Sequence, residues 1–523
     1  MDVLIGSRRP SLHFLHWHKE FSVRQITLYR SQDDRLRVPA GESVIDEFFR
    51  IFTPSLTPPR RHELLRRFLE QTGARHTLPD IIKCRVPAEN GRLVAIVDDR
   101  CDPCVQLMGI SDDTAFVPAR QWDSEEYIRR PPEGLHARVF GMDAKMLYAH
   151  LNQGRTGRAE RQTIYFVDLT PMTCLALISN VSYRHLPQVR SFLSRYVAFD
   201  SYMGLSQNRG FTLEFHLPHY ILRQDDDRIK DCRGLRKHRL FSLSGQDAIY
   251  EVQLSLIVYG VDDFFWTAYF CEDVYFRANN PVAEYLRDEE DGPSAGLRRT
   301  RFPIWDPRFY FLSNLVIRLG QITMEWTTLV EIISGDLDKH DDLFLEDDPS
   351  LTKTKEYTWL LNTLRRLRNL LSRVIATLIS FDANNGVYFD LESEGLLYNR
   401  FRDHFDQVRQ SAATLAAARM ILEQRIEALE KLSDVLVNAS SLSESITATR
   451  QGDNIRLLTY ISMIYLPVTL TTGVFGMNQV SGENAWWKYW VCLVCFTSGT
   501  IGIAIVLQMI IPRWRHGQGR LHS

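Results

Sequence analysis

Two long stretches without a charged side chain lie near the C-terminal end of the sequence. Asp, Glu, Lys, Arg and His are all absent from residues 457–482 and again from residues 489–512. As a helix, each stretch is long enough to cross about 30 Å of hydrocarbon. Because so few residues separate them, we predict an antiparallel helical hairpin with transmembrane spans at about 457–476 and 489–511. A pair of buried helices in a water-soluble core is the alternative.

Basic residues flank this hairpin unevenly. The loop carries one lysine, whereas five arginines lie just outside the two stretches: Arg450, Arg456, Arg513, Arg515 and Arg520. Positive charge stays on the cytoplasmic side of a membrane, so both termini are predicted to be cytoplasmic. Aromatic residues Trp486, Trp487, Tyr489 and Trp490 place a membrane interface near Lys488. We therefore expect a multi-pass integral membrane protein in contact with a lipid bilayer, in the plasma membrane or, alternatively, the mitochondrial inner membrane.

The first stretch carries hydroxyl and small residues along one side. Five positions spaced 4, 4, 3 and 4 residues apart share a helical face: Leu458, Ser462, Leu466, Thr469 and Gly473. Such a face suits a water-filled lumen, and it equally suits close packing against another helix. The second stretch is dominated by Val, Leu, Ile and Phe and can face lipid.

The first stretch ends in Gly476-Met477-Asn478 and contains Pro467 further back. This triplet, its place at the outer end of the first span, the short loop and the basic tail resemble the CorA-type magnesium channel superfamily. The resemblance implies a homopentamer in which the first span of every subunit lines a central pore. Gly476, Met477 and Asn478 would form its outer mouth, and the five-residue face above would line the lumen.

The resemblance also implies how an ion is selected. Mg²⁺ holds its water shell tightly, so Asn478 amide oxygens would bind the hydrated ion through its waters. Glu483 in the loop would add negative charge, although an exposed glutamate is commonly only a solvated residue. Leu458 and Leu466 would gate by dewetting. One departure concerns the inner end of the helix, where the family commonly has an Asn ring and this sequence has Gly452.

Three functions stay open at this stage. The first is a passive Mg²⁺ channel driven by membrane potential, with Mg²⁺ as transported and regulatory ion. The second keeps the fold and moves another divalent cation, Zn²⁺ or Co²⁺. The third is a membrane-anchored sensor or scaffold that does not conduct.

A helical stalk is predicted ahead of the membrane. Apolar residues recur there at coiled-coil-like spacing: Leu422, Ile426, Leu429, Leu432, Leu436, Ala439, Leu442 and Ile446. No proline occurs between Leu391 and Leu466, so one helix can continue into the first span. Helical patterns at 309–333 and 353–381 precede it, separated by an acidic run over residues 336–348.

The acidic run has two interpretations. It is typical of a solvated loop, whereas the resemblance implies a helix hairpin whose acidic tip approaches a basic ring after the second span. The gating charges implied in that case are Asp341, Asp342, Asp347, Asp348, Arg513 and Arg515.

The N-terminal half predicts an α/β layer, with strands at 92–98, 162–168, 211–216 and 250–258. The predicted fold class is an α/β cytoplasmic domain plus a long helical stalk and two C-terminal transmembrane helices, CorA-like and helix-dominated overall. We divide the chain into an N-terminal extension (1–85), an α/β funnel-like domain (86–290), a helical hairpin and stalk (291–456), and a transmembrane hairpin with a basic tail (457–523).

Composition and motifs exclude several other classes. A formal net charge of -2 gives no field for nucleic acid, so no nucleic-acid partner is expected. Eight cysteines in 523 residues do not make a disulfide framework, and Cys101-Asp-Pro-Cys104 lacks the second cysteine pair of a structural zinc site. His13, His16 and His18 are more typical of an incidental cluster than of a metal site. The sequence contains no phosphate-binding loop or hydrolase motif, so we predict no enzyme and no cofactor.

Overall fold

The computed structural model describes most of the chain in a series of segments. These are residues 16–24, 36, 42–50, 59–71, 93–100, 138–155, 159–207, 210–224, 230–240, 247–277, 279–340, 352–476 and 485–518. The chain divides into two compact units, Met1–Asp342 with Thr358–Leu429 and Leu343–Tyr357 with Glu430–Ser523. The first unit contains a β-sheet and the helices packed on it. The second contains the end of one long helix and the helix that follows.

The first unit is built on one mixed sheet of eight strands in the order β2-β1-β3-β8-β7-β5-β4, with β6 paired to β7 off this path. The central pair, β3 and β8, runs parallel, and the other paired strands run antiparallel. Every residue of β3 and β8 is buried, as expected for strands covered on both faces. The strands are β1 Ala95–Arg100, β2 Arg138–Met142, β3 Arg161–Val167, β4 Tyr202–Ser206, β5 Phe211–Gln224, β6 His238–Leu240, β7 Asp247–Gly260 and β8 Trp266–Glu272.

Four strands agree with the sequence expectations in place, but at least one end of each differs from the expected residue. The strand expected at 162–168 is confirmed as β3, and those at 211–216 and 250–258 belong to the longer β5 and β7. The strand expected at 92–98 begins later, at Ala95 of β1. The prediction for β5 stopped before Pro218, which has no N–H for a ladder. Pro218 is tolerated because β4 begins at Tyr202, opposite His216, so that among the described strands only β7 lies beside β5 at Pro218.

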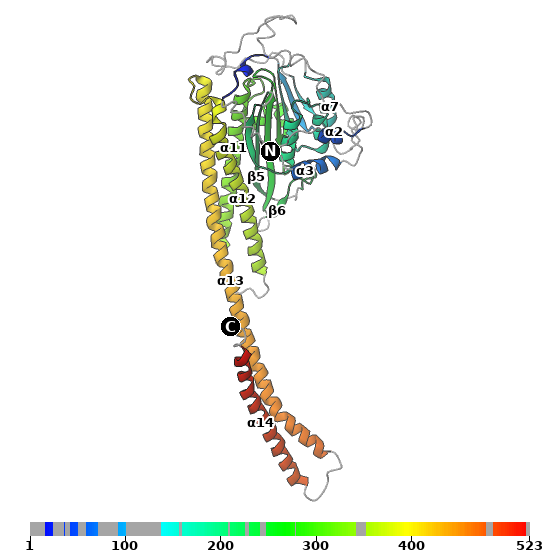
Figure 1. Ribbon diagram of the computed structural model, residues 1–523, viewed down its shortest axis with the longest axis vertical. Helices are drawn as coiled ribbons and strands as arrows, with labels where there is room; N and C mark the ends of the chain where they lie inside the picture. Colours follow the sequence, from blue (N-terminus) through cyan, green and yellow to red (C-terminus); the bar gives the residue numbers. More distant parts are fainter. Residues whose placement is uncertain are drawn as a thin grey trace, which may run out of the picture. The chain divides into compact units, whose positions relative to one another are not determined.

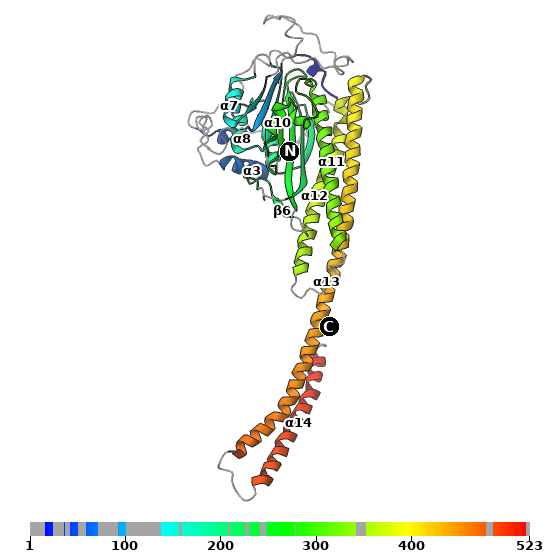
Figure 2. The same cartoon turned by 180° about the vertical axis from the view of Figure 1, so that it is seen from behind.

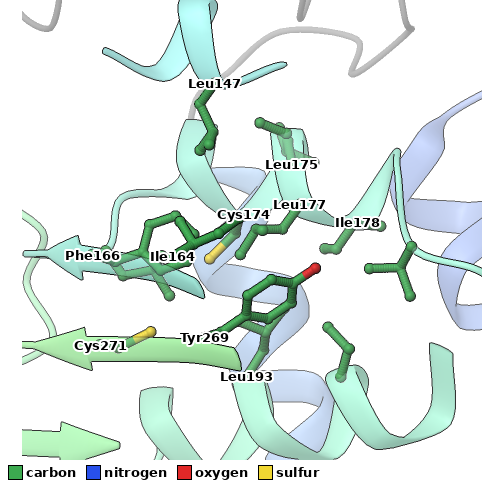
Figure 3. Packing of buried hydrophobic residues seen from close by; sticks show 14 of the residues in the cluster. Leu147, Ile164, Phe166, Cys174, Leu175, Leu177, Ile178, Leu193, Tyr269 and Cys271 are labelled. Atoms are coloured by element: carbon green, nitrogen blue, oxygen red, sulfur yellow. The ribbon is translucent and has the colours of Figure 1, made fainter. Parts of the chain in front are cut away.

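Helices pack on one face of the sheet, on the side where Figure 1 labels α2, α3 and α7. They are α2 Val44–Arg50, α3 Pro59–Glu70, α7 Ala144–Gln153, α8 Pro171–Ile178 and α9 Leu186–Val197. Asp143 starts α7 by accepting a hydrogen bond from the Met146 amide at 2.8 Å, and Thr170 caps α8 just before Pro171. Figure 3 shows Leu175 and Leu193 of these helices meeting strand residues Ile164, Phe166 and Tyr269 in one apolar core.

The opposite face of the sheet packs against α11 (Pro307–His340), as Figures 1 and 2 show from two sides. Three aromatic pairs join them, with ring centroids 5.3 to 5.9 Å apart. They are Phe215 with Phe311, Tyr220 with Trp326, and Trp266 with Tyr310. The short helix α10 (Pro281–Arg287) precedes α11. The sheet is therefore the middle layer of three.

Two further helices complete the helical part of the first unit. They are α12 (Thr352–Asn385) and the start of α13 (Leu396–Gly476), joined through a 3-10 turn at Gly386–Phe389. Phe381 of α12 stacks on Phe405 of α13 at 5.8 Å, and Phe389 contacts Phe405 at 5.2 Å. These rings fix the turn between the two helices.

The helices predicted at 309–333 and 353–381 are confirmed as α11 and α12, and both are longer than predicted. The acidic run therefore begins inside a helix rather than in a loop. Asp338 lies in the last turn of α11 and accepts hydrogen bonds from both terminal nitrogens of Arg425, at 2.6 and 2.8 Å. This pair explains why the helix continues past Ile333. Asp341, Asp342, Asp347 and Asp348 lie outside the described residues.

The long helix α13 runs unbroken from Leu396 to Gly476, with Pro467 inside it. This confirms the continuous helix expected from the absence of proline upstream. Along the predicted coiled-coil stripe, Leu422, Ile426 and Leu429 are buried, whereas Leu442 and Ile446 are exposed in the single chain. A coiled coil through the exposed positions stays a prediction, as do the four domain ranges. The last helix, α14, spans Ala485–Gln518.

Candidate functional site

The five residues expected to line a lumen all lie on α13 with their surfaces open. Leu458 and Leu466 are 64% and 65% exposed, values that are unusual for leucine in a folded chain. Ser462, Thr469 and Gly473 are exposed as well. We call these five residues the α13 stripe.

A second stripe on α13 is covered instead. Met463, Pro467, Thr471 and Phe475 recur every four residues and are buried or partly buried, and Thr471 is only 1% exposed. The Phe475 ring contacts the ring of Tyr489 in α14 edge-on at 5.5 Å. The partly buried residues of α14 also recur along one side: Tyr489, Cys492, Leu493, Thr497 and Thr500. We call the four α13 residues the α14-facing stripe.

The two stripes lie on opposite sides of α13. At 100° per residue their centres are about 160° apart around the helix axis. The α13 stripe therefore points away from α14, and no residue of its own hairpin covers it in the part of the chain that the structure describes. Sequence spacing predicted the α13 stripe but not its partner, because Pro467 and Thr471 do not stand out until α14 is placed.

Hydroxyl groups on α13 are arranged to present oxygen lone pairs. Thr469 donates its hydroxyl hydrogen to the Tyr465 carbonyl at 2.7 Å, so the lone pairs of Oγ1 stay available as acceptors. Thr471 makes the same bond to the Pro467 carbonyl at 2.6 Å, but beneath α14. Pro467 has no N–H, so the Met463 carbonyl loses its usual helical partner. On the exposed side of the helix, Thr469 therefore offers acceptor lone pairs, whereas Met463 and Thr471 belong to the α14-facing stripe.

Of the three residues expected to form the pore mouth, the structure describes only Gly476. Gly476 is the last residue of α13, is exposed, and has no atom within 4 Å of where a side chain would begin. Met477, Asn478 and Glu483 lie outside the described residues. Arg513 and Arg515 fall within α14, and their side chains are likewise outside the description. Among the described residues no cluster of three His, Cys, Asp or Glu side chains could hold a metal ion.

One stretch of the described chain is long and apolar enough to cross a membrane, Ser445–Gly476. It contains the whole α13 stripe and the α14-facing stripe. Only 11% of its most apolar window is buried within the chain, which distinguishes it from the core helix of a water-soluble protein. The second predicted span, in α14, stays a prediction.

A buried constellation in the sheet resembles a hydrolase triad, and sequence reasoning missed it. His216 lies 2.7 Å from Ser255 Oγ through Nδ1 and 2.7 Å from Glu214 through Nε2. The alternation of Glu214 and His216 along one strand was the available signal. All three side chains are buried, and Glu214 is also held by Arg195 through two contacts of 2.7 Å. Burial lowers the pKa of His216 despite Glu214, and no substrate can reach Ser255, so this array serves the core.

An open groove of about 590 Å³ lies beside the ends of β5 and β7. Arg223 lines it but is bound to Glu325 at 2.6 and 3.0 Å, and Asp247 and Arg277 line it as well. Its charges are therefore balanced, and the groove favours neither an anion nor a cation. Cys101, Cys104 and His13, which the sequence analysis considered and did not favour as metal ligands, lie outside the described residues.

Comparison with known proteins connects α13 and α14 to a family. Residues 393–508 match the model of the CorA-like Mg²⁺ transporter protein family. The cobalt/magnesium transport protein CorA of Thermotoga maritima is 27% identical over 124 residues, which cover 24% of this chain and 31% of that protein. The chain thus matches about a third of the length of that curated relative.

Two solved structures are also similar to this chain, each at 12% sequence identity. The CorA magnesium transporter from Methanocaldococcus jannaschii matches with a TM-score of 0.31 and 12% identity, over 79% of this chain and 97% of that chain. The ZntB cytoplasmic domain from Vibrio parahaemolyticus matches with a TM-score of 0.31 and 12% identity, over 55% and 92%. The family match spans both stripes of α13 and the Gly476-Met477-Asn478 triplet. Over residues 393–508, the chain is therefore similar to the CorA-like Mg²⁺ transporter protein family.

Proposed function

We propose that this protein is a channel for divalent cations, with Mg²⁺ as its main cargo, and that the α13 stripe lines the pore. The family match supports this assignment, because it covers the segment that would form the pore. The curated relative is named a cobalt/magnesium transport protein, which favours small divalent cations over other cargo. Influx is passive, since a divalent ion moving inward gains about 4.6 kcal/mol per 100 mV, twice the single-charge value.

The observation that carries the proposal is the opposition of the two stripes on α13. One helix cannot enclose a lumen, so several copies must bring their exposed stripes together around an axis. With α14 on the opposite side of α13, the same arrangement turns the apolar α14 outward toward lipid. In a ring of identical subunits, the α13 stripe of each copy faces the central lumen and α14 of each copy faces the lipid. We infer a homopentamer because the CorA-type resemblance implies five copies.

The chemistry of the α13 stripe suits a hydrated cation. Water molecules bound to Mg²⁺ point their hydrogens outward, so they need acceptors from the pore wall. Thr469 offers such lone pairs, because its own hydrogen is used by the Tyr465 carbonyl. Asn478 would present amide oxygens at the mouth, backed by Met477 and approached closely by the Gly476 backbone. Leu458 and Leu466 would form rings that exclude water and gate the pathway.

The proposed membrane arrangement is a hairpin of two spans, with both termini on the cytoplasmic side. Trp486 and Trp487 are 76% and 73% exposed at the start of α14, as aromatic residues at a lipid headgroup level would be. Glu483 would lie on the outer side and concentrate cations. On the inner side, attraction between the acidic segment containing Asp341, Asp342, Asp347 and Asp348 and the arginines Arg513 and Arg515 would bias the gate and weaken with salt. Cytosolic Mg²⁺ would act there as a regulatory ion.

The decisive experiment is ion uptake into liposomes by the purified full-length protein. With an inside-negative potential, the wild type should take up Mg²⁺, and Asn478→Ala should reduce the initial rate at least about ten-fold through loss of the ring of amide acceptors. Asn438→Ala is the matched control, because Asn438 is exposed on α13 far before the α13 stripe. Uptake that is unchanged by Asn478→Ala would contradict the pore assignment.

The same liposomes separate the alternative functions. Competition between Mg²⁺, Co²⁺ and Zn²⁺ for uptake identifies the cargo. If assembled wild-type protein passes none of these ions at any potential, the chain is instead a membrane-anchored sensor or scaffold.

A further inference from the structure

A short N-terminal segment, residues 16–24, is fastened onto the first unit by two aromatic side chains. Trp17 and Phe21 are each only 6% exposed. Their rings lie 5.1 and 5.6 Å from the ring of Phe211, at the first residue of β5. We call this segment the strap. It precedes the described sheet by more than seventy residues in sequence, so its position is set by these contacts rather than by its neighbours in the chain.

The strap closes on a buried carboxyl group in the turn between β7 and β8. The Trp17 indole N–H donates to Asp263 Oδ1 at 3.1 Å, and the Ser22 hydroxyl donates to Asp263 Oδ2 at 3.4 Å. The Asp263 amide in turn donates to the Phe21 carbonyl at 2.9 Å. Asp263 is 1% exposed, so the strap seals this carboxyl from water. One residue therefore holds the strap through three separate bonds.

The strap also reaches the turn between α12 and α13. The guanidinium of Arg308, in the first turn of α11, lies 4.9 Å above the Trp17 ring and 5.3 Å from the Phe401 ring of α13. Arg308 also lies 3.6 Å from Asp390, and His16 of the strap lies 3.6 Å from the same carboxylate. Closure of the strap is thus connected to the first turns of the helix that carries the α13 stripe.

We propose that residues 16–24 are a proton-sensitive strap, held closed by a proton on Asp263 and loosened when that proton leaves. The geometry carries the proposal. An ionised carboxylate at 1% exposure must be compensated by its surroundings, and here the surroundings supply two neutral donors and no direct salt bridge among the described residues. When the strap opens, Asp263 meets water and can ionise at little cost.

The groups around Asp263 act on its pKa in both directions, and burial has the largest effect. Burial raises the pKa of Asp263 to about 7, and the Asp306 and Asp262 carboxylates add to the rise. Arg308 and the Trp17 hydrogen bond act in the opposite direction but do not cancel it. Because the pKa is higher with the strap closed, closure is favoured in acid. That advantage is lost as the pH rises from about 4, the ordinary aspartate value, to about 7, and it stays lost above 7.

The test is hydrogen exchange of the full-length protein in detergent, followed in peptides that contain residues 16–24. Observed rates are divided by the intrinsic rates at each pH, so that base catalysis is removed. We expect the protection factor of the strap to fall at least about ten-fold between pH 5 and pH 7 and then to level off. Peptides from β3 in the same samples should keep their protection and serve as the internal control.

Two variants separate the strap from a general effect of pH. Asp263→Asn keeps an acceptor for the Trp17 indole without a charge, so strap protection should become independent of pH and match the wild-type value at pH 5. Glu20→Gln is the matched control, since Glu20 is an exposed acid on the strap itself, and it should behave like the wild type. A flat wild-type profile, or the wild-type pH dependence in Asp263→Asn, would overturn the proposal.

A second measurement keeps the proposal testable if Asp263→Asn does not fold. Trp17→Phe removes the indole donor while retaining an aromatic ring, and it should lower strap protection at pH 5 without changing the β3 peptides. Unchanged strap protection in Trp17→Phe would show that this contact does not hold the strap, and would also overturn the proposal.

Discussion

The Phe475 ring meets the Tyr489 ring edge-on, with 5.5 Å between the two ring centroids. This pair joins the last turn of α13 to the first turn of α14. It lies on the α14-facing stripe, so it fixes which side of α13 is covered and which side stays free. The rotation of α13 about its own axis, on which the proposed pore depends, therefore rests in part on one aromatic contact.

Removing the Phe475 ring should loosen the start of α14. Edge-to-face aromatic pairs contribute about 0.5–1.5 kcal/mol, so Phe475→Ala should increase local opening about 2- to 12-fold. Trypsin cleavage after Lys488, next to Tyr489, reports this opening in detergent-solubilised protein. Phe475→Tyr keeps the ring and should be cleaved at the wild-type rate. Equal cleavage of Phe475→Ala and the wild type would mean that the two helices are held elsewhere.

The Thr469 hydroxyl should matter for ion flux because of the side of α13 on which it lies. Thr469→Val keeps the shape of the side chain and removes the acceptor lone pairs. If one outer-sphere hydrogen bond to a hydrated ion is lost, uptake of Mg²⁺ into liposomes should fall about 2- to 12-fold, equivalent to about 0.5–1.5 kcal/mol.

The matched control for that measurement is Thr471→Val. Thr471 makes the same hydroxyl-to-carbonyl bond but lies beneath α14 at 1% exposure. Uptake should therefore be unchanged, although thermal stability can shift. A larger loss of uptake in Thr471→Val than in Thr469→Val would mean that the two stripes have been assigned to the wrong sides.

Local periodicity was sufficient to predict the helices and the α13 stripe. Leu458 and Ser462 share a face because of helical geometry alone, whatever surrounds them. The continuity of α13 followed for the same reason, since proline is the main interruption that a sequence reveals. The α14-facing stripe could not be predicted this way, because Pro467 and Thr471 do not continue an apolar repeat. Only the packing of α14 against α13 identifies that side of the helix.

Strands and long-range contacts were harder to predict than helices. Strand β8, Trp266–Glu272, was missed because its identity depends on pairing with β3 on one side and β7 on the other. The strap was missed for a similar reason. Trp17 and Asp263 are separated by 246 positions in sequence, and no local pattern connects an indole with a carboxyl group at that distance. The end of α11 was predicted too early, at residue 333, because the bond from Arg425 to Asp338 is also long-range.

The buried carboxylate of Asp273 should be one of the strongest single contributors to the stability of the first unit. It accepts hydrogen bonds from Arg236 Nε at 2.6 Å and Arg233 Nη1 at 3.0 Å. Asp273→Asn would leave the buried Arg236 guanidinium without its counter-charge and weaken the pairing of Arg233, which keeps Asp231 at 2.7 Å, and should destabilise the fold by about 3–5 kcal/mol. Thermal unfolding at neutral pH measures the loss. Glu325→Gln, at the partly exposed pair with Arg223, should cost at most about 1 kcal/mol.

The same carboxylate gives a pH dependence of known sign. Burial alone would raise the pKa of Asp273, but Arg236 and Arg233 outweigh burial and lower it to about 2. The folded pKa lies below the unfolded value, so this contribution is present above pH 4 and is lost as the pH falls toward 2. Acid unfolding followed by circular dichroism should show this loss in the wild type. A variant lacking the carboxylate should have a flatter profile in that window.

His404 should limit stability in mild acid. Its ring stacks on Phe309 at 5.5 Å, and neither ring nitrogen has a hydrogen-bond partner among the described residues. Burial, followed by the charge of Arg400, lowers the pKa of His404 to about 4. The unfolded chain therefore binds a proton at this histidine below about pH 6.5, whereas the folded chain does not until about pH 4. The free energy of unfolding decreases as the pH falls from 6.5 to 4.

His404→Phe keeps the ring stacking and removes this loss, so at pH 5 the variant should be more stable than the wild type by about 1–2 kcal/mol. The two proteins should differ less at pH 8, and melting curves at both pH values provide the comparison. A gain of equal size at both pH values would mean that packing, not protonation, is responsible.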